Sequence, residues 1–180
     1  IQDNDTPPSV NNITVNEASP YLIFTVTATS GKPLDLSLSS GTATVGTDTA
    51  STIEYYDPAA NSGSGGWRAY AAGFSVPTTA SGLLVRVAVC QDDNYEIGET
   101  LQLTATYSGA NSGGSGTATI IDNGTGDLFG AANNTGVPDV LGQSQDPSLP
   151  TSLDADNAIK INDVIVNEAS PYVNFQVSAL

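Results

Sequence analysis

Acidic side chains are concentrated at a few points of this sequence. They stand beside stretches that alternate like strands, and they are Glu17, Asp48, Asp92, Asp93, Glu96, Glu99 and Asp122. A hard divalent cation such as calcium takes about six to eight oxygen ligands, which loops at one end of a domain can supply from distant parts of the chain. Taken alone, the run "QDDNYEIGE" (91–99) has a simpler interpretation as an acidic loop in water. The chemistry of these acids therefore depends on the elements that position them.

The overall charge narrows the classes of function. The chain has 4 Lys and Arg against 19 Asp and Glu, a formal net charge of −15. Nucleic acid and anionic membrane surfaces would repel such a chain, so neither is an expected partner. Calcium is the counter-ion that so many carboxylates favour. The sequence contains no run of about 18 apolar residues, so we expect no membrane-spanning segment.

The side chains that most often perform catalysis are nearly absent. There is no His, no Met and a single cysteine, Cys90, which is expected to be a small residue on the second face of a strand. Bases, nucleophiles and transition-metal ligands are therefore scarce, and we expect no enzyme. A polysaccharide-cleaving site would need paired carboxylates such as Asp93 and Glu96, which are better explained as cation ligands.

Apolar and polar residues alternate along most of the first 123 residues, as in half-buried strands. Strands are expected at 11–16, 21–28, 34–43, near 51–56, 71–77, 82–90, 100–108 and 116–122. This pattern predicts an all-β protein: an immunoglobulin-like antiparallel sandwich of about seven strands over residues 6–123. Residues 124–158, rich in Gly, Pro, Asn and Asp, are expected to form a linker or extended arm, in which Leu128 and Phe129 could dock.

The heptapeptide "VNEASPY" occurs at 15–21 and again at 166–172. The similarity extends, at the same offset of 151 residues, to 10–28 and 161–179. Along the second strand one face is apolar in both copies, whereas the other face changes from Ile23 and Thr25 to Asn174 and Gln176. Residues 159–180 are therefore expected to be the first two strands of a second sandwich.

Two strands with an exposed apolar face are not stable alone in water, so residues 159–180 must complete a sandwich. The chain could continue into the remaining strands, or the hairpin could be donated to a neighbouring copy. Continuation is favoured, because each chain already has an equivalent pair at 10–28. Residues 1–4 resemble 120–123, and residues 1–5 are expected to end a preceding repeat. The apolar residues expected at the assembly interface are Val164, Val166, Tyr172, Val173, Phe175 and Val177.

The stretches "VNEASPYLIFTV", "SGTATVGTD", "LLVRVAVCQDDNYEIGETLQLTATYSGA" and "GTATIIDN" together resemble the Calx-beta repeat of sodium–calcium exchangers, integrins and long bacterial surface adhesins. The resemblance covers most of residues 10–123, and "DDNYEIGETLQL" is its most specific part. It implies a seven-stranded immunoglobulin-like sandwich with calcium bound at one end. The ligand positions that it implies are Glu17, Asp48, Asp92, Asp93, Glu96 and Asp122.

Two stretches depart from that pattern. The sequence "DNG" (122–124) replaces the acidic run that usually follows the last strand, which removes potential ligands. Residues 54–73 replace a short connection and carry Trp67, Arg68 and Tyr70, which could bind a glycan or another protein. Trp67 and Tyr70 are more simply expected to pack against the flank of the sandwich.

These features lead to two hypotheses of function. The first is a structural repeat unit of an extracellular adhesin, matrix protein or filament, in which calcium stiffens sandwiches joined end to end with adjacent copies. The alternative is an adhesion module that binds a glycan, a protein or a cell surface through the loop around Trp67. Three Asn-X-Thr triplets give weak support to a secreted location.

Overall fold

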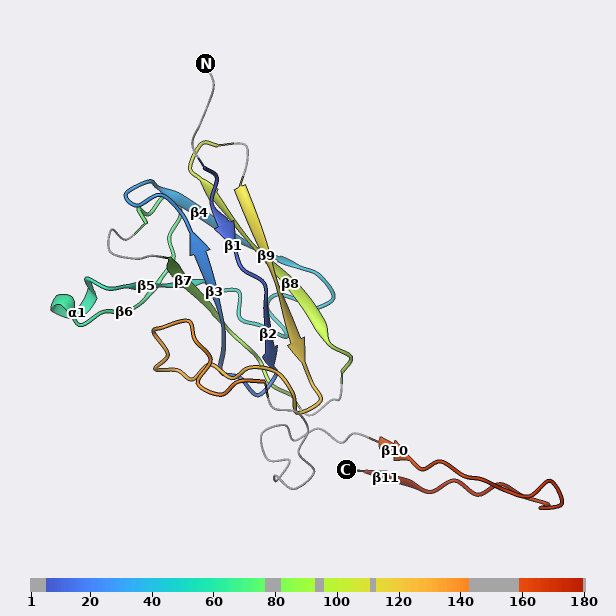
Figure 1. Ribbon diagram of the computed structural model, residues 1–180. Helices are drawn as coiled ribbons and strands as arrows, with labels where there is room; N and C mark the ends of the chain where they lie inside the picture. Colours follow the sequence, from blue (N-terminus) through green and yellow to red (C-terminus); the bar gives the residue numbers. More distant parts are fainter. Residues whose placement is uncertain (1–5, 77–81, 93–95, 111–112, 143–158, 180) are drawn as a thin grey trace.

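The computed structural model describes residues 6–76, 82–92, 96–110, 113–142 and 159–179. Two of its β-sheets pack face to face (Figure 1). The first sheet has the order β1-β3-β7-β5-β6, with β1 (Ser9–Val10), β3 (Tyr21–Thr27), β7 (Leu83–Ala88), β5 (Glu54–Asp57) and β6 (Gly66–Ala69). The second has the order β2-β9-β8-β4, with β2 (Ile13–Asn16), β9 (Gly113–Ile121), β8 (Glu99–Tyr107) and β4 (Leu34–Ser40). The predicted all-β sandwich is confirmed.

One strand pair departs from the expected antiparallel pattern. β1 pairs antiparallel with β3 in the first sheet, whereas β2 pairs parallel with β9 in the second. The chain changes sheets at Asn11 and Asn12, whose side chains replace bonds of the ladder. Thr25 donates its N–H to Asn11 Oδ1 at 2.6 Å, and Thr117 donates to Asn12 Oδ1 at 2.8 Å. A single N-terminal segment therefore contributes to both sheets.

Every second side chain of the central strands points between the sheets. The buried set includes Val15, Leu22, Phe24, Val26, Leu34, Val85, Leu101, Leu103 and Ala118. Full burial of a large apolar side chain contributes roughly 1.5–3 kcal/mol, so this alternation supplies the main stabilisation of the sandwich.

The region after β5 differs from the expected strands. β5 and β6 form a hairpin around the short α1 (Ala60–Gly63). The strand expected at 71–77 is not formed in the described part of that range, where Ser75 makes a single bridge. There Phe74 instead stacks on Tyr55, with ring centroids 4.3 Å apart, so aromatic contact attaches this stretch to the sandwich. No helix among the described residues is long and apolar enough to span a membrane.

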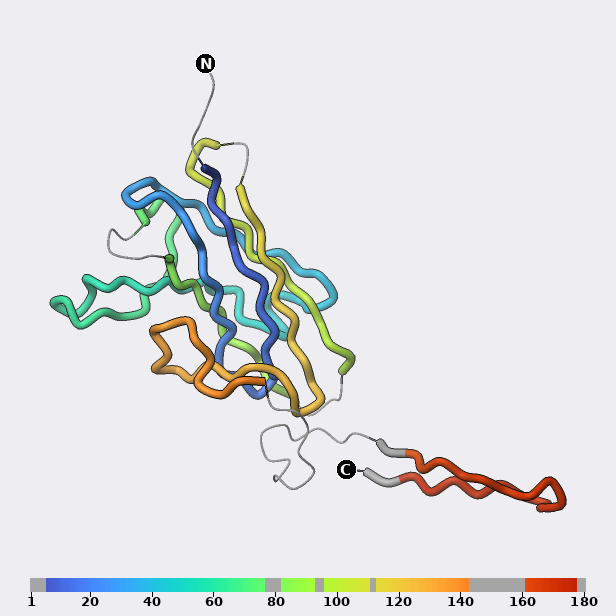
Figure 2. Tube along the Cα trace, in the orientation of Figure 1, coloured from blue at the N-terminus to red at the C-terminus, as the bar shows by residue number. Residues whose placement is uncertain are grey.

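Residues 127–140, called the clasp below, lie against the outer face of the first sheet beside β3 and β7 (Figure 2). They belong to the expected linker or arm, but this part is docked. Phe129 is buried, forms a bridge with Tyr21 and donates its N–H to Ser19 Oγ at 2.8 Å. Docking of Phe129 was anticipated from the sequence, whereas the extent of the clasp was not. Residues 143–158 lie outside the described part.

Arg86 of β7 is a second attachment point of the clasp. Its guanidinium carbon lies 3.9 Å from the ring centroid of Tyr21 and 4.3 Å from that of Trp67. Its Nε donates to Glu54 Oε2 at 2.7 Å, and its Nη1 donates to the carbonyl of Ala131 at 3.0 Å. Arg86 is only 8 % exposed, and a charge buried so deeply is tolerated because it is paired, hydrogen-bonded and stacked.

The C-terminal residues form a separate hairpin with β10 (Ile159–Ile161) and β11 (Val177–Ala179). It pairs Lys160 with Ser178 and Ile161 with Val177. These pairs lie at the offset of the sequence repeat from the β1–β3 register. The repeat is therefore one of backbone geometry as well as of sequence.

Candidate metal centre

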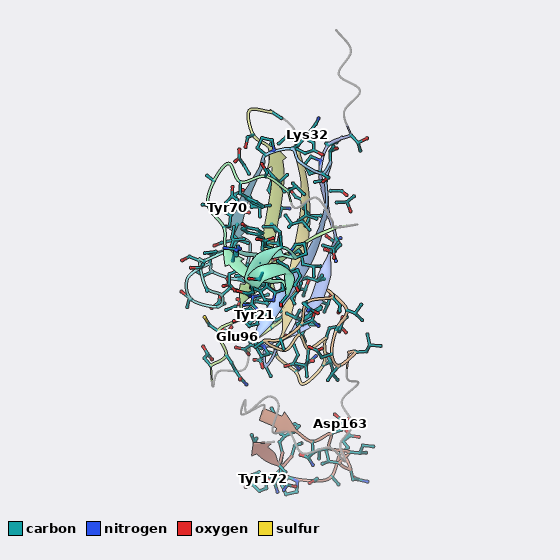
Figure 3. The ribbon with its side chains drawn as sticks, turned by 90° about the vertical axis from the view of Figure 1, so that its left-hand side faces the viewer. Tyr21, Lys32, Tyr70, Glu96, Asp163 and Tyr172 are labelled. Carbon is teal, nitrogen blue, oxygen red and sulfur yellow. The ribbon has the colours of Figure 1, made fainter. Side chains whose placement is uncertain are left out.

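Acidic side chains from four segments meet at one end of the sandwich. Glu17 lies in the turn between β2 and β3, Asp48 between β4 and β5, Glu96 between β7 and β8, and Asp122 directly after β9. Figure 3 shows Glu96 toward the end of the sandwich opposite Lys32. Segments far apart in sequence thus supply oxygens to one place.

The turn between β2 and β3 holds Glu17 in position. Ala18 donates its N–H to Asn16 Oδ1 at 2.7 Å, and Glu17 donates its own N–H to the carbonyl of Ile121 at 2.9 Å. The carboxylate then accepts a bond at Oε1 from the N–H of Asp92 at 3.2 Å. Glu17 is 7 % exposed, so this carboxylate faces the protein rather than solvent.

Local bonds also fix the other carboxylates. Thr44 donates its N–H to Asp48 Oδ2 at 2.6 Å, which closes the loop around Asp48, and Cys90 donates to the carbonyl of Asp48 at 2.9 Å. Glu96 donates its N–H to Asp122 Oδ2 at 2.5 Å. Asp122 is 4 % exposed. Backbone amides therefore hold both aspartates before any ligand arrives.

These carboxylates line a single pocket. Its lining residues are Glu17, Asp48, Cys90, Glu96, Ile97, Glu99, Ile120 and Asp122. Within it, carboxylate oxygens of Asp48, Glu96 and Glu99 all lie within 4.8 Å of one another. Oxygens so close can bind a common cation.

The pKa of Glu99 reports the electrostatics of the pocket. Burial raises it from 4.5 to about 7, with further contributions from the charges of Asp48 and Glu96, a hydrogen bond with Asp48, and the charge of Asp92. Partial desolvation and neighbouring negative charge both disfavour the ionised form. Near neutral pH Glu99 is therefore partly protonated, and a bound cation would favour its ionised form.

Among the residues whose side chains are described, the basic ones make contacts elsewhere and do not neutralise the acidic pocket. Arg68 pairs with Asp57 at 2.8 Å, Arg86 pairs with Glu54, and Lys32 lies over the ring of Tyr107. Apart from the thiol of Cys90, the polar side chains that line the pocket are carboxylates, which are hard oxygen ligands. This donor set fits calcium rather than a soft transition metal.

The structure brings together most of the positions implied by the resemblance. Glu17, Asp48, Glu96 and Asp122 line the pocket, and Asp92 borders it through its bond to Glu17. Asp93 lies outside the described residues. Whether these residues bind calcium stays a prediction.

Glu99 was absent from the implied ligand set, although it lies in the three-carboxylate cluster. The alternation of buried and exposed residues along β8 could have identified Glu99 as a residue of this site. Glu99 shares a strand face with Leu101 and Leu103, both buried, so its side chain points inward at the end of the core. A carboxylate at the inward end of a strand is partly desolvated, whereas one in a solvated loop is not.

The residues proposed for the alternative binding surface contribute to packing. Trp67 donates Nε1–H to the carbonyl of Asn133 at 3.1 Å and stacks on Arg86. The hydroxyl of Tyr70 accepts the N–H of Leu36 at 2.9 Å. Arg68 is exposed. Glycan binding by this loop stays a prediction.

The proposed assembly residues lie on the C-terminal hairpin. Large exposed apolar side chains there include Val166, Tyr172, Val173, Phe175 and Val177, whereas Val164 is partly covered.

Comparison with known proteins gives a distant structural likeness. No protein-family model matches the sequence, and no curated protein matches it. The crystal structure of CBD12 from CALX1.2 matches with a TM-score of 0.44 and 18 % identity over 66 % of this chain and 46 % of that one. The crystal structure of the calcium binding domain CBD12 of CALX1.1 matches with a TM-score of 0.46 and 18 % identity, over 66 % of this chain and 46 % of that one. The apo-form Calx CBD1 domain gives 0.41 and 17 % over 66 % of this chain and 99 % of that one. This chain spans less than half the length of the first two.

Proposed function

We propose that this chain is a calcium-stabilised structural unit of an extracellular adhesin, matrix protein or filament, and not an enzyme. The observation that carries the proposal is the cluster of Asp48, Glu96 and Glu99, whose oxygens lie within 4.8 Å of one another. Like charges held this close repel one another unless a proton or a cation neutralises them. Calcium favours several hard oxygen ligands, and the pocket supplies them.

The position of the pocket supports a structural role for the ion. Asp122 directly follows β9, and the next residues lead into the clasp. Asn16 donates its Nδ2–H to the carbonyl of Thr125 at 2.9 Å and its N–H to the carbonyl of Asp127 at 3.0 Å. Calcium held by Glu17 and Asp122 would tie the turn beside Asn16 to the point where the chain leaves the sandwich. A fixed exit direction is what sandwiches joined end to end require.

Direct calcium binding tests this proposal. Titration calorimetry of the full chain is expected to give saturable binding, with a Kd of about 0.1–1 mM if the site resembles other extracellular modules. The Asp48→Asn variant removes one negative charge from the cluster and is expected to weaken binding at least about tenfold. Asp163→Asn, on the exposed hairpin, is the matched control and is expected to bind as the parent does. Equal binding by both variants would contradict the assignment of the site.

A further inference from the structure

The C-terminal hairpin has the conformation of the first hairpin although it lacks the surrounding sheets. Asn162 donates its N–H to the carbonyl of Gln176 at 3.2 Å, and Gln176 donates to Asn162 Oδ1 at 2.7 Å. Asn11 and Thr25 make the same two bonds at 3.2 and 2.6 Å. The turns match as well, because Ala169 donates to Asn167 Oδ1 as Ala18 does to Asn16 Oδ1. The second hairpin is therefore preformed for a sandwich.

The first copy shows what normally covers the inner face of this hairpin. Phe24 is fully buried between strands of the two sheets, whereas the equivalent Phe175 is 61 % exposed. In the first copy β7 pairs along β3, and β9 runs parallel to β2. An occupant of the second hairpin must supply the same two strands and an apolar layer.

The outer faces of the two hairpins differ in chemistry. Ile23 is 1 % exposed although it points away from the inter-sheet core. Its neighbours on this face lie at the clasp: Arg86, paired with Ile23, bonds to Ala131, and Thr25 lies near Gly136. A methyl group added at Gly136 of the clasp would lie 2.6 Å from Leu84 Cδ2 and 3.4 Å from Thr25 Oγ1. Glycine is needed at Gly136 for this close approach and for its φ of +71°.

The second hairpin does not fit beneath a clasp. Asn174 stands where Ile23 is buried, so an amide would lose water and the apolar contact of Ile23 would be lost. Gln176 stands at the position of Thr25, where even a Cβ added at Gly136 would come within 3.4 Å of Thr25 Oγ1, so a longer side chain has little space beneath a clasp. Both replacements suit an outer face in contact with water.

We propose that residues 159–179 are the first hairpin of a second sandwich that has no clasp, and that the strands of this sandwich are supplied by a continuation of the same polypeptide. The inference rests on the proposed end-to-end assembly and specifies its partner. The sandwich of another copy is disfavoured as the acceptor, because its site already holds residues 8–28 and its outer face is covered by a clasp. The two polar residues thus disfavour exchange of hairpins between units.

The first test exchanges residues between the copies within the full chain. The double variant Ile23→Asn, Thr25→Gln is expected to keep the sandwich folded but to release the clasp. Hydrogen exchange of the amides of residues 127–140 should become about tenfold faster or more, as expected for burying an unpaired amide. Thr14→Ile makes a similar exchange between copies at an exposed position and is the matched control. A clasp that stays protected in the double variant would overturn the inference.

The second test supplies the missing strands. The full chain is extended after Leu180 by a second copy of its own residues 30–123, which omits the clasp. Amides of residues 164–178 are expected to exchange freely in the parent chain and to slow in the extended chain to the rates of residues 13–27. Failure to slow would overturn the inference, as would a parent chain that forms dimers with residues 164–178 protected.

These tests separate the inference from the proposed function. If the chain binds calcium but the hairpin of the extended chain stays unprotected, the second sandwich is contradicted and the calcium role is not. If the hairpin is protected but the chain does not bind calcium, only the calcium role is contradicted.

Discussion

Glu99 lies where the apolar core of the sandwich meets its acidic end. Its pKa in the folded state, about 7, exceeds the ordinary value of 4.5, so between these pH values the folded state binds more protons than the unfolded state. The stability contributed by the protonated carboxyl is complete below about pH 4.5 and is lost as pH rises through 7. Without divalent cation, the free energy of unfolding should therefore fall over this window.

Denaturant unfolding at several pH values in chelator checks this prediction. Glu99→Gln is expected to flatten the fall, because it removes the titrating group, whereas Glu168→Gln, on the exposed hairpin, should leave it unchanged. Saturating calcium should also remove the fall, because the ion requires the ionised carboxylate. A Glu99→Gln profile parallel to that of the parent would show that Glu99 does not titrate in this range.

At the scale of elements, Arg86 links β7, β5 and the clasp. Arg86→Ala would leave Glu54 without its partner and remove the cation between two rings, with an expected loss of roughly 2–4 kcal/mol of unfolding free energy. Arg68→Ala removes an exposed ion pair with Asp57 and should cost less than about 1 kcal/mol. Chemical denaturation measures both, and equal losses would contradict the role assigned to Arg86.

The same elements explain what the sequence could predict. Alternation identified the strands of the core because each buries one face against a neighbouring sheet. It did not reveal the clasp, whose apolar residues Leu128, Phe129 and Val140 follow no period, or the burial of Ile23, which alternation assigns to the outer face. The acidic end could be predicted from loop composition, whereas Glu99 required knowledge of which face of β8 points inward.

In the whole molecule, the acidic end of the sandwich is connected to the clasp, because Asn16, beside Glu17, bonds to Thr125 and Asp127. Calcium in the pocket would neutralise the repulsion among carboxylates and hold this connection. The hairpin repeats the opening of the sandwich with an outer face suited to a unit without a clasp. Units linked in this way would form an extended molecule, as the proposed assembly requires.

Thermal unfolding of the full chain in calcium and in chelator measures whether the ion stabilises the folded sandwich. A ligand that binds only the folded state stabilises it by about 2.7 kcal/mol at 100 times its Kd, which for a chain of this size corresponds to a rise in Tm of roughly 5–10 °C. We expect a rise that grows with calcium concentration. Identical melting curves in calcium and in chelator would contradict the account.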